Sequence, residues 1–123
     1  MPHVKLEYTE NVQWKNPIQD IFPELQTVLI QYARVKPENC KSRATELKDF
    51  HCAGKSHSDG FIHLEISLLS GRTEEVKTNI GKECCQIIQS FIENIAEIQV
   101  SVELRDMDHN CYCLLYTSPS PRD

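Results

Sequence analysis

Phe61-Ile62-His63-Leu64-Glu65-Ile66-Ser67-Leu68-Leu69 is the most strongly patterned run of this chain. Apolar residues occupy every second position from Ile62 to Leu68, and the end residues Phe61 and Leu69 are apolar as well. A short run that is apolar on both faces is typical of a strand inside a sheet. We therefore predict a central strand over residues 61–69.

A helix and a further strand are predicted after this run. The turn Ser70–Glu75 offers Thr73 as an N-cap, and its two glutamates suit the positive end of a helix dipole. Apolar residues at three- and four-residue spacing then predict a buried helical face: Val76, Ile80, Cys84, Ile87, Ile88, Phe91 and Ile95. Apolar and polar residues alternate from Ile98 to Arg105, which predicts the last strand.

Two strands are predicted on the N-terminal side. Apolar and polar residues alternate from Pro2 to Thr9, which indicates a half-buried strand. The segment Ser42–Cys52 alternates more weakly, and we interpret it as the second strand of this half.

A helix is predicted between these two strands. Asn16 is a suitable N-cap and Pro17 suits the first helical position. One apolar helical face follows: Ile18, Ile21, Phe22, Leu25, Val28, Leu29 and Tyr32. Pro23 falls inside this run, so the helix either begins later or bends there, and Pro37 closes the segment.

The order of elements predicts a duplicated β-α-β unit. The two halves cover about residues 2–53 and 61–108, and a repeat of about 59 residues pairs Pro2 with Phe61. Right-handed crossovers then give an α/β fold (an α+β sandwich), a four-stranded mixed sheet with two helices on one face. Apolar residues on the other face of the central strand would need a partner, which predicts an oligomer.

Composition restricts the class of protein. A chain of 123 residues predicts a single domain, taken here as residues 1–112. The net charge of −5 gives no support for nucleic-acid binding, and no apolar run approaches the ~20 residues of a membrane span. The N-terminus lacks the pattern of a signal peptide, so we expect a cytoplasmic protein.

No metal site or disulfide framework is predicted. The 6 cysteines include no CxxC pair, so we interpret them as reduced thiols. His51 and His57 lie in a polar connector, Ala53–Gly60 and the residues before it, without a third ligand at suitable spacing.

The segment 113–123, Cys-Leu-Leu-Tyr-Thr-Ser-Pro-Ser-Pro-Arg-Asp, differs from everything before it. It resembles a translated reading frame of an adapter used in sequencing libraries, and the other interpretation is a short native tail. We leave it out of the fold prediction. The native chain is expected to continue beyond Tyr112 with other residues.

Pro2 is the first candidate for catalysis. Removal of Met1 would leave a secondary amine in a rigid ring at the N-terminus. An α-amino group titrates near pH ~7.7–8.0, and burial or a nearby cation lowers this value toward the range where a general base works best. The alternative is that Pro2 only begins a strand, where a missing N–H is harmless.

A β-α-β duplication that begins at an N-terminal proline resembles the tautomerase superfamily, and in particular the 5-carboxymethyl-2-hydroxymuconate Δ-isomerase family. The residues that carry this resemblance lie in the same order and separation as in the family: Met1-Pro2-His3, Glu7-Tyr8-Thr9, Asn11, Ser42-Arg43, Phe61-Ile62-His63-Leu64 and Gly71-Arg72-Thr73-Glu74-Glu75-Val76-Lys77. The resemblance extends from residue 1 to about residue 105.

The resemblance implies a homotrimer with an active site around each N-terminal proline, near a subunit interface. It implies that Pro2 moves a proton within an unsaturated 2-hydroxy or 2-oxo dicarboxylate, of the kind met in aromatic-compound catabolism, without metal or organic cofactor. Arg43 and Arg72 match the arginines that bind carboxylates and stabilise the oxygen on which charge develops. Lys41 stands where bacterial members tend to carry arginine, and lysine lacks the bidentate fork.

Each of these side chains also has a structural interpretation. Arg72 could instead be a turn residue paired with Glu74 or Glu75, and Arg43 could be a surface charge. His63 lies on a strand, where a hydrogen-bonded structural role is favoured over a catalytic one. Lys41 and His63 are the candidates for substrate binding.

Three other functions stay open. One is a tautomerase of broad specificity with another enol or halogenated acid as substrate. A second is a non-catalytic trimer that binds protein partners. A third is a ferredoxin-like binding module, in which Pro2→Ala would have no effect on function.

Overall fold

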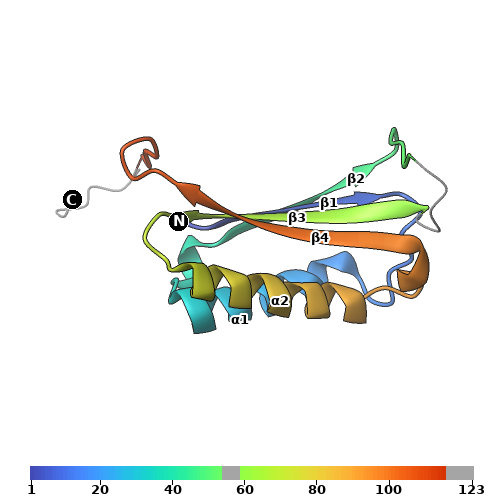
Figure 1. Ribbon diagram of the computed structural model, residues 1–123, viewed down its shortest axis with the longest axis horizontal. Helices are drawn as coiled ribbons and strands as arrows, with labels where there is room; N and C mark the ends of the chain where they lie inside the picture. The colour runs from blue at the N-terminus through green and yellow to red at the C-terminus, as the bar shows by residue number, and fades with distance from the viewer. Residues whose placement is uncertain (54–58, 116–123) are drawn as a thin grey trace.

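The structure is a computed structural model that describes residues 1–53 and 59–115. A four-stranded sheet carries two helices on one of its faces (Figure 1). The elements in chain order are β1 (His3–Thr9), η1 (Ile18–Asp20), α1 (Ile21–Ala33), η2 (Pro37–Asn39), β2 (Lys41–Leu47), β3 (Gly60–Leu69), α2 (Glu74–Ser90), η3 (Ile95–Glu97) and β4 (Ile98–Met107), where η denotes a short 3₁₀ helix.

The sheet confirms the predicted duplication. Its strand order is β2-β1-β3-β4, with β1 parallel to β2 and β3 parallel to β4. The two βαβ units meet through the antiparallel central pair β1 and β3, in which Leu6 lies opposite Leu64. Because each crossover carries one helix onto the same face, α1 and α2 pack side by side beneath the sheet (Figure 1).

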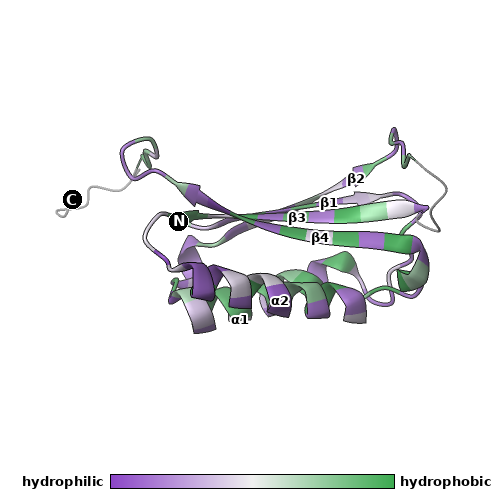
Figure 2. Ribbon diagram, viewed as in Figure 1, coloured by the Kyte–Doolittle hydropathy of each residue, from purple (hydrophilic) through white to green (hydrophobic). Residues whose placement is uncertain are grey.

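The core lies between the sheet and the helices. Figure 2 shows hydrophobic stretches, in green, in both the strands and the helices. Ile21, Leu25 and Leu29 of α1 have buried counterparts 59 residues further along: Ile80, Cys84 and Ile88 of α2. The helices therefore repeat at the predicted spacing. The strands do not, because the alternation of buried residues requires an even spacing, and Val4 and Leu6 match Ile62 and Leu64. The counterpart of Pro2 is thus Gly60, and the predicted pairing with Phe61 is wrong by one residue.

Three predicted boundaries are wrong. Asn16 is not the N-cap of α1, because the helix begins at Ile21 without a side-chain cap. The alternative of a later start is confirmed, and Pro23 lies in the first turn, where a missing N–H costs nothing. Strand β2 ends at Leu47 rather than Cys52. Helix α2 ends at Ser90, before the predicted Ile95. The predicted N-cap of α2 is confirmed, because the Thr73 hydroxyl accepts a hydrogen bond from the Val76 N–H at 3.2 Å.

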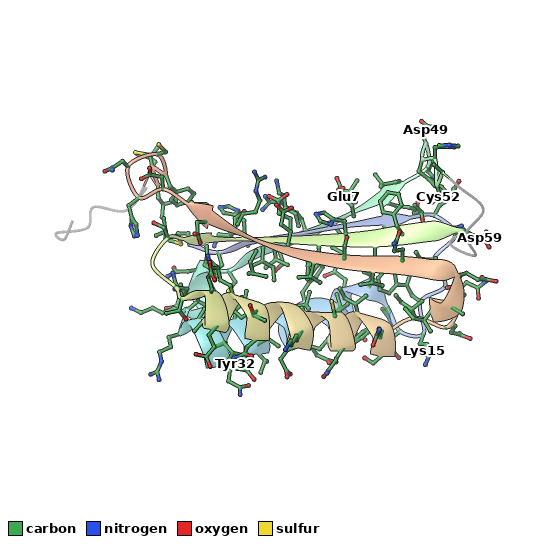
Figure 3. All side chains as sticks on the ribbon, in the orientation of Figure 1. Glu7, Lys15, Tyr32, Asp49, Cys52 and Asp59 are labelled. Atoms are coloured by element: carbon green, nitrogen blue, oxygen red, sulfur yellow. The ribbon has the colours of Figure 1, made fainter. Side chains whose placement is uncertain are left out.

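The face of the sheet away from the helices, called the open face below, is largely polar. Glu7 projects from it, on the opposite side of the molecule from Tyr32 of the helix layer (Figure 3). The carboxylate of Glu65, in the middle of β3, forms ion pairs with Lys5 at 3.7 Å and with Arg105 at 3.4 Å. The two apolar residues of β3 on this face, Phe61 and Leu69, lie at its ends and are half-buried. That they pack against a partner stays a prediction.

None of the helices within residues 1–53 and 59–115 is long and apolar enough to cross a membrane.

Gly60 lies at the end of the sheet far from the N-terminus, and its close packing predicts that a larger residue there destabilises the protein. A Cβ atom there would overlap the Thr9 hydroxyl and the Asn11 side-chain oxygen. These two atoms are hydrogen-bonded to each other at 2.6 Å, and the Asn11 amide donates to the Asp59 carbonyl at 2.8 Å, so neither can move freely. We expect Gly60→Ala to lower the free energy of unfolding by about 1–3 kcal/mol in urea denaturation.

Gly81→Ala in α2 is the matched control. Its Cβ would lie 3.8 Å from Leu104, an ordinary contact. Because alanine favours a helix by about 1 kcal/mol over glycine, this variant is expected to be as stable as the wild type or more stable. Equal destabilisation by both substitutions would contradict the packing described around Gly60.

Candidate active site

One end of the sheet gathers most of the predicted site residues. The N-terminus, the start of β2, the turn from β3 to α2 and the segment after β4 all lie at this end (Figure 1). Lys41 N–H donates to the Pro2 carbonyl at 3.0 Å, and Ser70 N–H donates to the Met107 carbonyl at 2.9 Å. These bonds join the N-terminus to β2 and the turn to β4, and the pairing of β1 with β3 joins the two pairs.

The amino terminus lies in a partly buried, cationic environment. Pro2 is buried, with Val4 and Leu6 following it on the helix side of β1. Burial is the larger cause and the Arg72 guanidinium the next, and together they lower the pKa of the Met1 amine from its ordinary value. Cys40 lies close enough to act in the opposite direction. A lowered pKa gives a larger fraction of neutral amine at neutral pH.

Arg72 is held on the helix side of the sheet by backbone carbonyls from both halves of the chain. Its Nη1 donates to the Leu69 carbonyl and its Nη2 to the Ala33 carbonyl, each at 3.0 Å. Ala33 ends α1, so the guanidinium also satisfies a carbonyl at the negative end of a helix dipole. The preceding Gly71 has φ of 130°, a conformation that favours glycine, which directs the chain from β3 toward α2.

The alternative interpretation of Arg72 as a partner of Glu74 or Glu75 finds no support in the described residues, where its hydrogen bonds go to carbonyls. A guanidinium carries five N–H donors, and these two bonds leave others available to an anion. Arg72 is thus fixed in position by two of its five donors.

Arg43 lies on the open face of the sheet. Its Nη1 lies 3.0 Å from Nδ1 of His3, and Nε2 of His3 lies 3.0 Å from the Tyr112 hydroxyl. Lys41 is exposed on the same face, and its Nζ donates to the Glu38 carbonyl at 3.2 Å. Within one chain, Arg43 and Lys41 therefore lie on one face of the sheet and Arg72 on the other. The amino terminus lies at the start of β1, between these two groups.

His63 lies further along the open face, opposite Glu7 in the register of β1 and β3. Its Nδ1 is 2.7 Å from the Ser101 hydroxyl and its Nε2 is 3.3 Å from Glu103. These contacts favour the structural role over the substrate-binding one. With Lys5, Glu7 and Glu65 it lines a cavity of about 80 Å³, which is small for a diacid.

Three residues at this end of the sheet are not predicted from the sequence as members of the site. Cys40 precedes β2 beside the amino terminus, and burial raises the pKa of its thiol. His3 follows Pro2 directly, but nothing in its strand pattern marks it as a contact of Arg43. Tyr112 follows β4 by several residues, and no sequence signal places it against β1.

The described residues contain no group of three His, Cys, Asp or Glu side chains that could hold a metal ion. The cysteines within them are free thiols, and burial raises the pKa of Cys84 to about 12. Most of the predicted tail, residues 116–123, lies outside the described residues, as does His57.

The environment of His3 predicts a pH dependence of stability. Burial, then Arg43, the amino terminus, Lys5 and Lys41, lower the pKa of His3. A histidine whose pKa is lowered by folding stabilises the protein above its unfolded-state pKa of about 6.5, and this contribution is lost as the pH falls through the folded pKa. Urea unfolding between about pH 7.5 and 5 should therefore show a larger loss of stability for the wild type than for His3→Gln. Equal losses would contradict the environment described for His3.

Comparisons with known proteins agree with this fold. The 5-carboxymethyl-2-hydroxymuconate isomerase family matches residues 2–113. The crystal structure of a 5-carboxymethyl-2-hydroxymuconate isomerase from Deinococcus radiodurans R1 is 26% identical in sequence, with a TM-score of 0.77 over 93% of this chain and 88% of that chain. No curated protein matches the sequence.

Two more distant structures share the fold alone. A fused 4-OT wild-type symmetric trimer is 16% identical, with a TM-score of 0.72 over 91% of this chain and 90% of that chain. A macrophage migration inhibitory factor-like protein from Entamoeba histolytica is 12% identical, with a TM-score of 0.64 over 94% of this chain and 96% of that chain. Because the family match covers nearly the whole described chain, the protein belongs to the 5-carboxymethyl-2-hydroxymuconate isomerase family of the tautomerase superfamily.

Proposed function

We propose that the protein is a cofactor-independent isomerase that moves a proton within an unsaturated 2-hydroxy or 2-oxo dicarboxylate, with Pro2 as the general base. The observation that carries the proposal is the lowered pKa of the amino terminus beside Arg72. After removal of Met1, the amine belongs to the next residue, Pro2, which is buried. We expect burial and the Arg72 guanidinium to lower the pKa of this amine in the same direction and so to favour its neutral form, which is the form able to accept a proton.

The proposed reaction has two proton transfers. The Pro2 nitrogen takes the proton of the 2-hydroxy group of a dienol diacid, which leaves a dienolate and a prolyl ammonium. The free N–H groups of Arg72 stabilise the negative oxygen, and their fixed position means that little reorganisation is needed. The ammonium then returns the proton to a more distant carbon, so that the double bond moves and the amine is regenerated.

Arg43 is the proposed ligand of a substrate carboxylate, with Lys41 as an additional charge on the same face. Arg43 and Arg72 lie on opposite faces of one sheet. A single substrate can contact both arginines in two ways. It can reach around the end of β1 within one chain, or it can bind Arg72 of one subunit and Arg43 of a neighbouring subunit. The second arrangement agrees with a homotrimer, the assembly that the fused 4-OT structure shows for a protein of this fold.

The isomerase proposal is tested with 2-hydroxymuconate, an unsaturated 2-hydroxy dicarboxylate. Ketonisation is followed by ultraviolet absorbance with protein whose intact mass shows that Met1 is absent. We expect turnover well above the uncatalysed rate. A folded, Met1-free protein that leaves the rate of ketonisation unchanged would overturn the proposal.

The second candidate is a non-catalytic trimer that binds a protein partner. It is favoured only by the fold shared with the macrophage migration inhibitory factor-like protein. Inactivity of the folded trimer toward the enol would leave this candidate as the better account.

A further inference from the structure

We propose that Tyr112 and His3 are positioning residues that hold the Arg43 guanidinium for its carboxylate ligand. This inference rests on the proposed function for the role of Arg43. The contacts that carry it form a chain across the open face, from the Tyr112 hydroxyl to His3 and from His3 to Arg43, with both distances at 3.0 Å.

The direction of these hydrogen bonds follows from the chemistry of the groups. A guanidinium can only donate, so Nδ1 of His3 accepts from Arg43 and carries no proton. A neutral imidazole then has its proton on Nε2, and this N–H donates to the Tyr112 oxygen. Arg43 thus sets the tautomer of His3, and the Tyr112 hydroxyl, which can donate or accept, accepts from Nε2 in that tautomer and holds the ring in place. A second proton on His3 would occupy the Nδ1 lone pair and end the contact with Arg43.

Tyr112 is itself held in place by the segment that follows β4. Cys111 N–H donates to the Asp108 carbonyl at 2.9 Å, which closes a turn, and His109 Nε2 lies 2.8 Å from the Ser70 carbonyl. The Tyr112 ring packs edge-on against the His3 ring, with 5.8 Å between centroids. Because Ser70 lies in the turn that leads to Arg72, one segment ties together the surroundings of both arginines.

In this geometry Tyr112 affects carboxylate binding only by way of Arg43. A fixed guanidinium loses less side-chain entropy when it binds a carboxylate than one that is free to move. Removal of the hydroxyl should therefore weaken the binding of a dicarboxylate, and should have no further effect once Arg43 is absent.

The test is a double-mutant cycle with Tyr112→Phe and Arg43→Ala in the full chain, with the dissociation constant of muconate as the measured quantity. Phenylalanine keeps the ring and removes only the hydroxyl. We expect Tyr112→Phe to weaken muconate binding about 2- to 10-fold in the presence of Arg43, the loss expected for one hydrogen bond. In the Arg43→Ala background the same change should alter binding by less than about 2-fold, the limit of additivity for independent sites. Equal effects in both backgrounds, or no effect in the wild-type background, would overturn the proposal.

Tyr8→Phe is the control for the loss of a tyrosine hydroxyl. Tyr8 lies near the opposite end of β1, where its ring packs edge-on against Trp14 at 5.3 Å between centroids. This variant should bind muconate as the wild type does.

A second measurement judges the chain of contacts without any ligand. Nitrogen-15 NMR of the imidazole, assigned with His3→Gln, should show Nδ1 unprotonated and Nε2 protonated in the wild type above the pKa of His3. A proton on Nδ1 would overturn the proposal even if the protein is an isomerase. Conversely, if the wild-type protein is inactive, the isomerase proposal fails. The NMR measurement and the double-mutant binding cycle can still be made and interpreted.

Discussion

Pro2→Ala is expected to lower kcat/KM for ketonisation of 2-hydroxymuconate by about 10²-fold or more, toward the 10²–10⁴ range attributed to a general base. Alanine is small enough for Met1 still to be removed, so both proteins begin with a free amine. The variant loses the ring that fixes the direction of the nitrogen and gains a flexible, better hydrated primary amine. Both changes reduce the population of amine that is correctly placed to accept the proton.

Pro17→Ala is the matched control for Pro2→Ala. Pro17 precedes η1 and is exposed, away from the amino terminus. It should retain wild-type kcat/KM. If Pro2→Ala also retains it, Pro2 only begins a strand and another group is the base.

Arg72→Ala is expected to have the second largest effect, with two separable parts. Loss of the charge beside the developing oxyanion should lower kcat by about 10²–10³-fold, the cost of removing one preorganised donor. Loss of the bonds to the Leu69 and Ala33 carbonyls should lower the free energy of unfolding by about 1–3 kcal/mol. Urea unfolding measures the second part, and kinetics on the folded fraction measure the first.

Two further variants separate charge from anchoring. Arg72→Lys keeps a cation but loses the fork that contacts two carbonyls, so it should recover more of kcat than of stability. Arg34→Ala removes an arginine that follows α1 directly, and should leave kcat unchanged. A folded Arg72→Ala protein with wild-type kcat would exclude Arg72 from the reaction.

The arrangement of the fold could be predicted because its core strands and helices have simple patterns. Residues 61–69 carry an apolar residue at every second position, and β3 spans Gly60–Leu69 with those residues on its buried face. The two helical faces repeat at the same spacing that the buried residues of α1 and α2 show in the structure. The order of the strands and helices and the spacing of their apolar residues were therefore enough to predict the topology.

The contacts of the site could not be predicted in the same way. Arg72 donates to the carbonyl of Ala33, which lies in the other half of the chain. No side-chain pattern marks a backbone carbonyl at a helix end as the acceptor for a distant arginine. The weak alternation of β2 reflects its position at the edge of the sheet, where most of its side chains are exposed. Contacts that join Tyr112 to His3 depend on the path of an irregular segment, which has no periodicity from which to derive it.

The protonation of Pro2 is the most direct test of the account. In Met1-free protein labelled with nitrogen-15 proline, Pro2 is the one proline with a titratable nitrogen, because every other proline nitrogen is part of an amide. We predict that this nitrogen titrates at a lower pH in the folded protein than in the same protein unfolded in urea, as burial and Arg72 require. Titration at the unfolded value or above it would mean that the amine is protonated in the folded enzyme at neutral pH, and would contradict its role as the base.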